Sequence, residues 1–148
     1  MAEKKQSLKS ISLKVLVVNG SNRQKSNSAI LTEKAIEELK KYENTEIRSL
    51  EFYNKNYGRF DNRKDIDEWI ENWEWADTII FLLPNYTVGG PGTFYEALER
   101  LSEVSELKIR EGIYEKTAGV LMQGSAQYGM VELALESTFQ MLAGLHVI

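Results

Sequence analysis

Small polar residues and one arginine directly follow an apolar stretch near the start of the chain. Glycine and hydroxyl residues before a helix let several backbone N–H groups point at one spot, where the helix dipole adds positive potential. The side-chain donors in this loop are Ser21, Ser26, Asn27 and Ser28, and Arg23 adds a charge. The loop therefore predicts a site for an anion of phosphate size, and a capped turn without a ligand is the alternative for the loop taken by itself.

The spacing in "GSNRQKS" differs from that of two common nucleotide-binding loops. It lacks the spacing and the lysine of a Walker loop, and no G-x-G-x-x-G occurs in the chain. Neither an ATPase nor a dinucleotide-binding Rossmann domain is supported.

Two further loops combine glycine with tyrosine. The segment "PNYTVGGPG" contains Tyr86, and "QGSAQYGM" contains Tyr128. Glycine lets the backbone approach a flat ligand closely, and a tyrosine ring offers an aromatic face with a polar tip. Each loop alone is an ordinary turn, but together with the phosphate loop they predict a ligand with one phosphate and one flat heterocycle, as in FMN.

Strands and helices that would position these loops alternate along the chain. Apolar runs predict strands over residues 13–18, 45–52, 78–83 and 116–122. Helical spacing predicts a first helix with Asn27 or Ser28 as its N-cap, and further helices over residues 66–76, 93–104 and 131–142. The first strand is predicted to be central, the second an edge, and the third interior, because residues 78–83 have no polar face. Crossover helices imply a doubly wound α/β domain with a parallel sheet, whose ligands bind beyond the carboxyl ends of the strands. All three loops leave those ends.

Bulk properties limit the possible functions. A chain of 148 residues fits one domain, which we expect over residues 13–148, with a flexible N-terminal tail over residues 1–12. The net charge of -4 predicts no nucleic-acid partner, and no segment is long and apolar enough to predict a membrane span. The chain has no cysteine, so a cytoplasmic setting is expected, and His146 is its one histidine. A thiol nucleophile, a Ser-His-Asp triad and a multi-histidine metal site are therefore not expected.

The loops resemble those of the NADPH-dependent FMN reductases and related iron–sulfur flavoproteins of the flavodoxin-like superfamily. "GSNRQKSNS" is similar to the family's phosphate loop, G-S-x-R-x-x-S/G-x-S/T, and "WADTIIFLLPNYTVGGPGTFYEALER" is similar to its A-D-x-I-I-x-x-x-P-x-Y segment with the following P-G and helix. "TAGVLMQGSAQYGMVELALESTFQMLAGLHVI" resembles its last strand, loop and helix. The resemblance implies a flavodoxin-like three-layer α/β/α fold with strand order 2-1-3-4-5, in which the fifth strand, opening at residues 146–148, and the last helix are short or missing.

The resemblance also implies which residues bind FMN. The FMN phosphate would lie on Ser21, Arg23, Ser26, Asn27 and Ser28; the ring would lie against Pro84, Asn85, Tyr86, Thr87 and Val88, with Gly124, Ser125 and Gln127 on its other side. NADPH or NADH would reduce the FMN, and the electrons would pass to a small-molecule acceptor such as a flavin, quinone, azo compound or metal ion. The flavin carries this chemistry, so no catalytic side chain and no bound metal are expected.

Family members usually form dimers or tetramers, so a homodimer or homotetramer is expected. Four tyrosines look exposed in the sequence and are either candidates for such an interface or ordinary surface residues: Tyr53, Tyr57, Tyr95 and Tyr128.

The chain departs from the family pattern after the second loop. Where the family often has Leu-Lys-Asn-x-x-Asp, this chain has Phe94, Tyr95, Glu96 and Glu99, which leaves the choice of pyridine nucleotide open. The missing cysteines exclude an iron–sulfur cluster. The alternatives are an FMN-binding electron carrier without its own NAD(P)H turnover and a flavin-free structural or regulatory relative. A phospho-receiver domain needs acidic residues at the end of the first strand, where this chain has Asn19 and Gly20.

Overall fold

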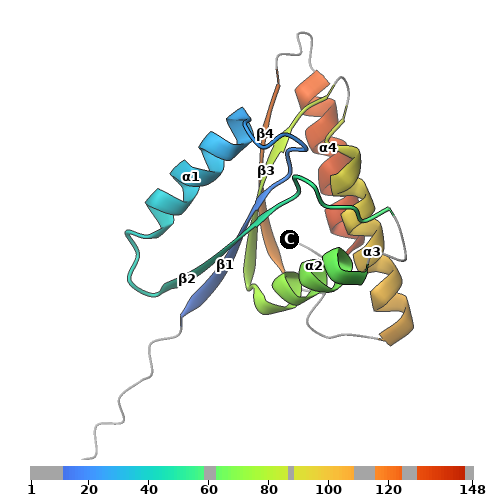
Figure 1. Ribbon diagram of the computed structural model, residues 1–148, viewed down its shortest axis with the longest axis horizontal. Helices are drawn as coiled ribbons and strands as arrows, with labels where there is room; N and C mark the ends of the chain where they lie inside the picture. The colour runs from blue at the N-terminus through green and yellow to red at the C-terminus, as the bar shows by residue number, and fades with distance from the viewer. Residues whose placement is uncertain (1–11, 59–62, 87–88, 109–115, 125–129, 146–148) are drawn as a thin grey trace, which may run out of the picture.

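The computed structural model describes residues 12–58, 63–86, 89–108, 116–124 and 130–145 (Figure 1). Along them run β1 (Leu13–Asn19), α1 (Asn27–Leu39), β2 (Thr45–Glu51), α2 (Arg63–Trp75), β3 (Thr78–Pro84), α3 (Gly92–Lys108), β4 (Thr117–Gln123) and α4 (Met130–Gly144). The predicted alternation of strands and helices is confirmed. Apart from residue 12, the predicted N-terminal tail lies outside the described residues, as does the predicted fifth strand at residues 146–148.

The four strands form one parallel sheet in the order β2-β1-β3-β4. This order confirms the flavodoxin-like, doubly wound architecture, with β1 central, β3 interior and β2 at an edge. The seven residues of β3 read TIIFLLP, without a charged side chain, because the strand has neighbours on both edges and packing on both faces. The charged residues of β2, in contrast, are tolerated at the edge of the sheet.

Helices cover both faces of the sheet. Among the described helices, α1 lies on one face and α2, α3 and α4 lie on the other (Figure 1). Successive side chains of a strand point to opposite faces, so Val15 and Val17 pack against α1, whereas Leu16 and Val18 belong to the larger core on the other side. None of the described helices is long and apolar enough to cross a membrane.

Aromatic side chains dominate the larger core. Trp69 and Trp73 of α2 are fully buried with their rings 5.4 Å apart, and the Trp69 indole N–H donates to the Ala97 carbonyl at 2.8 Å. The bond satisfies the polar tip of a buried indole and fastens α2 to α3.

The prediction that Tyr57 is exposed is wrong. After β2 the chain folds back toward α2, and the Tyr57 ring is fully buried, 5.1 Å from the ring of Phe52. Tyr53 and Tyr95 are half-buried, and Tyr128 lies outside the described residues. Tyr57 is therefore part of the core and is unavailable for an interface.

Candidate functional site

The described residues that follow β1, β3 and β4 lie together at one edge of the sheet. The strands are parallel and neighbouring, with Asn19 opposite Leu82 and Pro84 opposite Gln123, so their carboxyl ends lie together. An open cavity of about 550 Å³ is found there. The residues that line it are Ser21, Arg23, Lys25, Ser26, Asn27, Pro84, Asn85, Tyr86, Gln123 and Gly124.

Buried polar side chains shape the loop after β1. The Asn19 side-chain oxygen accepts from the Ser21 backbone N–H at 3.1 Å, and the Ser21 hydroxyl accepts from the Arg23 backbone N–H at 3.1 Å. Gly20 donates to the Leu82 carbonyl at 3.0 Å, and a Cβ at Gly20 would lie only 2.4 Å from a methyl carbon of Leu83. The residue that follows β1 is thus held against β3, and any side chain at Gly20 would require the Leu83 side chain to shift.

The first turn of α1 faces the same cavity. Ser26 is the N-cap, since its backbone is extended and its hydroxyl accepts from the Ala29 N–H at 3.1 Å. The prediction that Asn27 or Ser28 caps this helix is therefore wrong by one or two residues; all three are good capping types, and only Ser26 precedes the first helical residue. Asn27 is exposed at the cavity. Ser28 is fully buried beneath it, and its hydroxyl accepts from the Gln123 side-chain N–H at 3.3 Å.

The charge of the cavity is positive. Arg23 and Lys25 are both exposed at its lining, and none of the described lining residues is acidic. The Arg23 guanidinium lies 5.9 Å from the centre of the Tyr86 ring, within reach of a cation–π interaction. In a chain of net charge -4, two cations beside a helix N-terminus concentrate positive charge at this point.

Another part of the cavity lining comes from the loop after β3. The Asn85 backbone continues the pairing with β4, donating to the Gln123 carbonyl at 2.7 Å. Its side chain is 9% exposed, and neither its oxygen nor its nitrogen has a hydrogen-bond partner. Gly124 lies directly against it, because a Cβ there would be 2.9 Å from the Asn85 Cβ. A buried polar group without a partner costs about 1 to 3 kcal/mol, so this carboxamide fits a ligand that supplies a donor and an acceptor.

Most predicted site residues that the structure describes meet in this cavity. Ser21, Arg23, Ser26, Asn27, Pro84, Asn85, Tyr86 and Gly124 line it, and Ser28 lies beneath it. Thr87, Val88, Ser125 and Gln127 lie outside the described residues. Lys25 and Gln123 also line the cavity and were not predicted. Lys25 falls between two predicted residues of one loop, and Gln123 is the polar last residue of a strand that ends at this edge. The position of each residue in the sequence therefore indicates that it could line the cavity.

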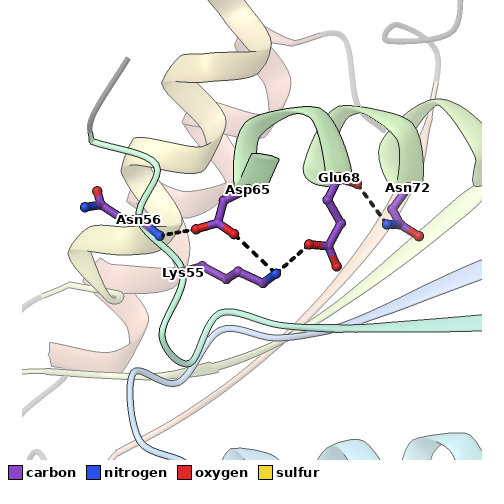
Figure 2. Close-up of polar contacts among 5 residues, drawn as sticks. All are labelled: Lys55, Asn56, Asp65, Glu68 and Asn72. Atoms are coloured by element: carbon purple, nitrogen blue, oxygen red, sulfur yellow. Dashed lines mark hydrogen bonds and ion pairs between the residues drawn. The ribbon is translucent and has the colours of Figure 1, made fainter. Parts of the chain in front are cut away.

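A second group of ionisable residues lies where the segment after β2 meets α2 (Figure 2). The Lys55 ammonium lies 2.5 Å from a Glu68 carboxylate oxygen and 3.4 Å from one of Asp65, and Asp65 also accepts from the Asn56 backbone N–H at 3.0 Å. Partial burial lowers the pKa of Lys55, but the hydrogen bond and charge of Glu68, together with Asp65, outweigh it and raise the pKa above its usual value.

Tyr57 lies beside this group. Burial, and then the charges of Asp65 and Glu68, raise the pKa of its phenol, and its hydroxyl has no hydrogen-bond partner. No group of three or more metal-ligating side chains occurs within the part of the chain that the structure describes. The ionisable group therefore fastens the segment after β2 to α2 and has the arrangement of a structural contact.

Comparison with known proteins links this architecture to flavin enzymes. The family model described as NADPH-dependent FMN reductase matches residues 13–148. No curated protein sequence matches the chain. A solved NADH:FMN oxidoreductase in its apo form is similar at 19% identity and a TM-score of 0.71, over 93% of this chain and 73% of that one.

Two further solved structures are similar to the chain. A flavoenzyme NAD(P)H:(acceptor) oxidoreductase from Paracoccus denitrificans has 18% identity and a TM-score of 0.72, over 92% of this chain and 74% of that one. An azoreductase from Bacillus anthracis has 16% identity and a TM-score of 0.68, over 92% of this chain and 83% of that one. At these identities the structural likeness concerns the fold.

Proposed function

Because the chain belongs to the NADPH-dependent FMN reductase family, we propose that FMN binds in the cavity at the carboxyl ends of β1, β3 and β4. The family makes the chain an FMN-dependent oxidoreductase that takes electrons from NAD(P)H. One observation carries the assignment of the cavity: its two sides differ in chemistry as the two ends of FMN do. One side has two cations at a helix N-terminus, and the other has a tyrosine ring and a buried carboxamide without a partner.

The cationic side would hold the phosphate. Arg23 and Lys25 supply charge, and the hydroxyl and amide side chains of Ser21, Ser26 and Asn27 supply hydrogen bonds around the N-terminus of α1. Ser28 supports this turn from below through its bond with Gln123.

The other side would hold the ring. Pro84 and Gly124 present backbone and small side-chain surface, and Tyr86 presents a ring that is 38% exposed. The Asn85 carboxamide offers one donor and one acceptor to the polar edge of the heterocycle. Thr87, Val88, Ser125 and Gln127 remain predicted contacts on this side.

The redox chemistry is supplied by FMN, which accepts a hydride from NAD(P)H and passes electrons to a small acceptor when it is bound. None of the described residues that line the cavity is Asp, Glu or His, so this part of the lining offers no general acid or base of these types. The chain's own residues therefore bind the phosphate, orient the ring and present one of its faces to the second substrate.

A homodimer or homotetramer is part of this proposal. Leu133 and Phe139 of α4 are 58% and 49% exposed, which supports contact with another copy. The absence of cysteine is in keeping with a cytoplasmic protein.

Two measurements on one protein sample test the function. The protein, freed of flavin, is titrated with FMN while flavin fluorescence is recorded, and the complex is then mixed with NADPH or NADH while the visible flavin absorbance is followed. We expect binding of one FMN per chain and bleaching by at least one nucleotide. Failure to bind FMN would overturn the proposed site. Binding without bleaching by either nucleotide would instead indicate an electron carrier.

A further inference from the structure

The first turn of α3 contacts both loops that build the two sides of the cavity. The Thr93 hydroxyl donates to the Asn22 side-chain oxygen at 2.8 Å, across 71 residues of sequence. Two residues later, the Tyr95 hydroxyl accepts from the Gly90 backbone N–H at 2.9 Å. Asn22 lies between Ser21 and Arg23 in the loop after β1, and Gly90 belongs to the loop that carries Tyr86.

Tyr95 is well placed to hold the loop that contains Gly90. Its ring packs edge-on against Phe94 with the ring centres 5.5 Å apart, and Phe94 is itself fully buried against Phe81, 5.2 Å away. The Tyr95 ring, and with it the hydroxyl, is therefore held in place by its packing against Phe94 of the core. A Cβ at Gly89 would lie 3.3 Å from the hydroxyl oxygen, so the backbone at this point approaches the tyrosine closely.

The contact continues from Gly90 to the cavity through the backbone. Gly89 and Tyr86 form an antiparallel bridge, in which the Tyr86 N–H donates to the Gly89 carbonyl at 2.8 Å and the Gly89 N–H donates to the Tyr86 carbonyl at 3.4 Å. Tyr86 lines the cavity, next to the unpartnered carboxamide of Asn85. Moving Gly90 thus moves the backbone that carries the Tyr86 ring.

We propose that the first turn of α3 positions the two sides of the cavity separately: Thr93 positions the phosphate side through Asn22, and Tyr95 positions the ring side through Gly90 and Gly89. Both are positioning residues, because neither lines the cavity itself. The proposal rests on the proposed function, since it assigns the two sides to the two ends of FMN.

The test uses two single variants and two ligands, FMN and riboflavin, which lacks the phosphate. Tyr95→Phe keeps the ring and removes the hydroxyl; loss of one backbone hydrogen bond predicts a fall of about three- to tenfold in affinity for both ligands. Thr93→Val keeps the shape of the side chain and is expected to weaken FMN by a similar factor while leaving riboflavin within about twofold. Tyr42→Phe is the control, because Tyr42 is 67% exposed and is not among the cavity residues.

A second readout separates positioning from general destabilisation. In the flavin-free protein, the amide of Gly90 should exchange its hydrogen faster in Tyr95→Phe, whereas amides in the centres of β1 and β3 keep their rates. With flavin bound, Tyr95→Phe should also shift the visible absorbance bands or the midpoint potential of the flavin, and Thr93→Val should leave both unchanged.

The outcomes distinguish this proposal from the proposed function. If the wild type binds FMN but the two variants weaken FMN and riboflavin in the same pattern, or Tyr95→Phe changes neither Gly90 exchange nor the flavin spectrum, the positioning proposal is overturned. If the wild type binds no flavin, the proposed function fails. In that case, unchanged hydrogen exchange at Gly90 in flavin-free Tyr95→Phe would also show that the Tyr95–Gly90 contact on which the positioning role depends is absent.

Discussion

Replacing Arg23 by alanine gives the sharpest test of which side of the cavity takes the phosphate. A hydrogen bond to a charged group is worth about 1.5 to 3 kcal/mol. Arg23 is exposed, so solvent screens its charge and places its contribution near the lower limit. We therefore expect Arg23→Ala to weaken FMN binding by about 1.5 kcal/mol, which is roughly tenfold in the dissociation constant.

The same substitution has a small effect on riboflavin. The Arg23 guanidinium lies 5.9 Å from the Tyr86 ring centre, and an exposed cation–π contact of this kind contributes about 0.5 kcal/mol, or roughly twofold in affinity. If Tyr86 helps to hold the flavin ring, riboflavin binding falls by that smaller factor. The preference for FMN over riboflavin should then decrease by roughly fivefold.

The assay is a pair of fluorescence titrations of flavin-free protein at fixed ionic strength. Lys34→Ala is the matched control, because Lys34 is an exposed cation of the neighbouring helix that pairs with Glu37 at 2.7 Å and is not among the cavity residues. It should leave both affinities unchanged. Added salt should reduce the difference between wild type and Arg23→Ala for FMN, since charge is the cause. An equal loss for FMN and riboflavin, or the same loss in Lys34→Ala, would refute the assignment of the phosphate side.

Three further substitutions test the core, the ionisable group and the ring side. Tyr57→Phe removes a buried, unpartnered hydroxyl, so the free energy of unfolding in urea should rise by up to about 1 kcal/mol, and a clear loss would show that the hydroxyl has a hydrogen-bond partner. Because the folded protein raises the pKa of Tyr57, this residue's contribution to stability is present below about pH 10 and is lost as the pH rises further; the wild type should lose more stability there than Tyr57→Phe. Lys55→Met leaves two carboxylates without their cation and should lower the free energy of thermal unfolding by about 1 kcal/mol. Lys41→Met, the control at an exposed ion pair, should lower it by less than about 0.5 kcal/mol. Equal losses would contradict a special role for the contacts of Lys55. Gly124→Ala places a Cβ 2.9 Å from the Asn85 Cβ, so both flavins should bind roughly tenfold more weakly, and unchanged affinity would show that Asn85 does not form the ring side.

The fold could be predicted from the sequence because burial leaves a direct pattern. The stretch TIIFLLP has no charged residue, and this composition requires a strand with neighbours and cover on both faces, as β3 has. The weaker alternation in TEIRSLE indicated an edge, which β2 is. Ligands of open parallel sheets bind beyond the carboxyl ends of the strands, so the predicted strand directions alone indicate where the candidate site lies.

Details of the site could be predicted only in part. Ser26, Asn27 and Ser28 are equally good capping types, so sequence alone did not distinguish the N-cap, which is exposed to the cavity, from Ser28, which is buried beneath it. Gln123 begins the loop segment that the sequence singles out, but nothing in the sequence indicates that its side chain reaches Ser28 of α1. Tyr57 was misjudged because the burial of a loop residue depends on where the loop returns, and that is set by tertiary packing with Trp69 and Phe52.

The contacts of α3 show why the order of strands matters for the chemistry of this cavity. β3 pairs with β1, so the loop after β3 and the helix that follows it must begin beside the loop after β1. This neighbourhood brings Thr93 to Asn22 and Tyr95 to Gly90, although nothing in the local sequence requires either contact. The stretch from Phe94 to Glu99, where the chain departs from the pattern it resembles, therefore follows Thr93 directly and contains Tyr95, which contacts the loop that carries Tyr86. A substitution in this turn can change how tightly and in which orientation a flavin is held without touching the flavin itself, and so can separate the affinity for the phosphate from the fit of the ring.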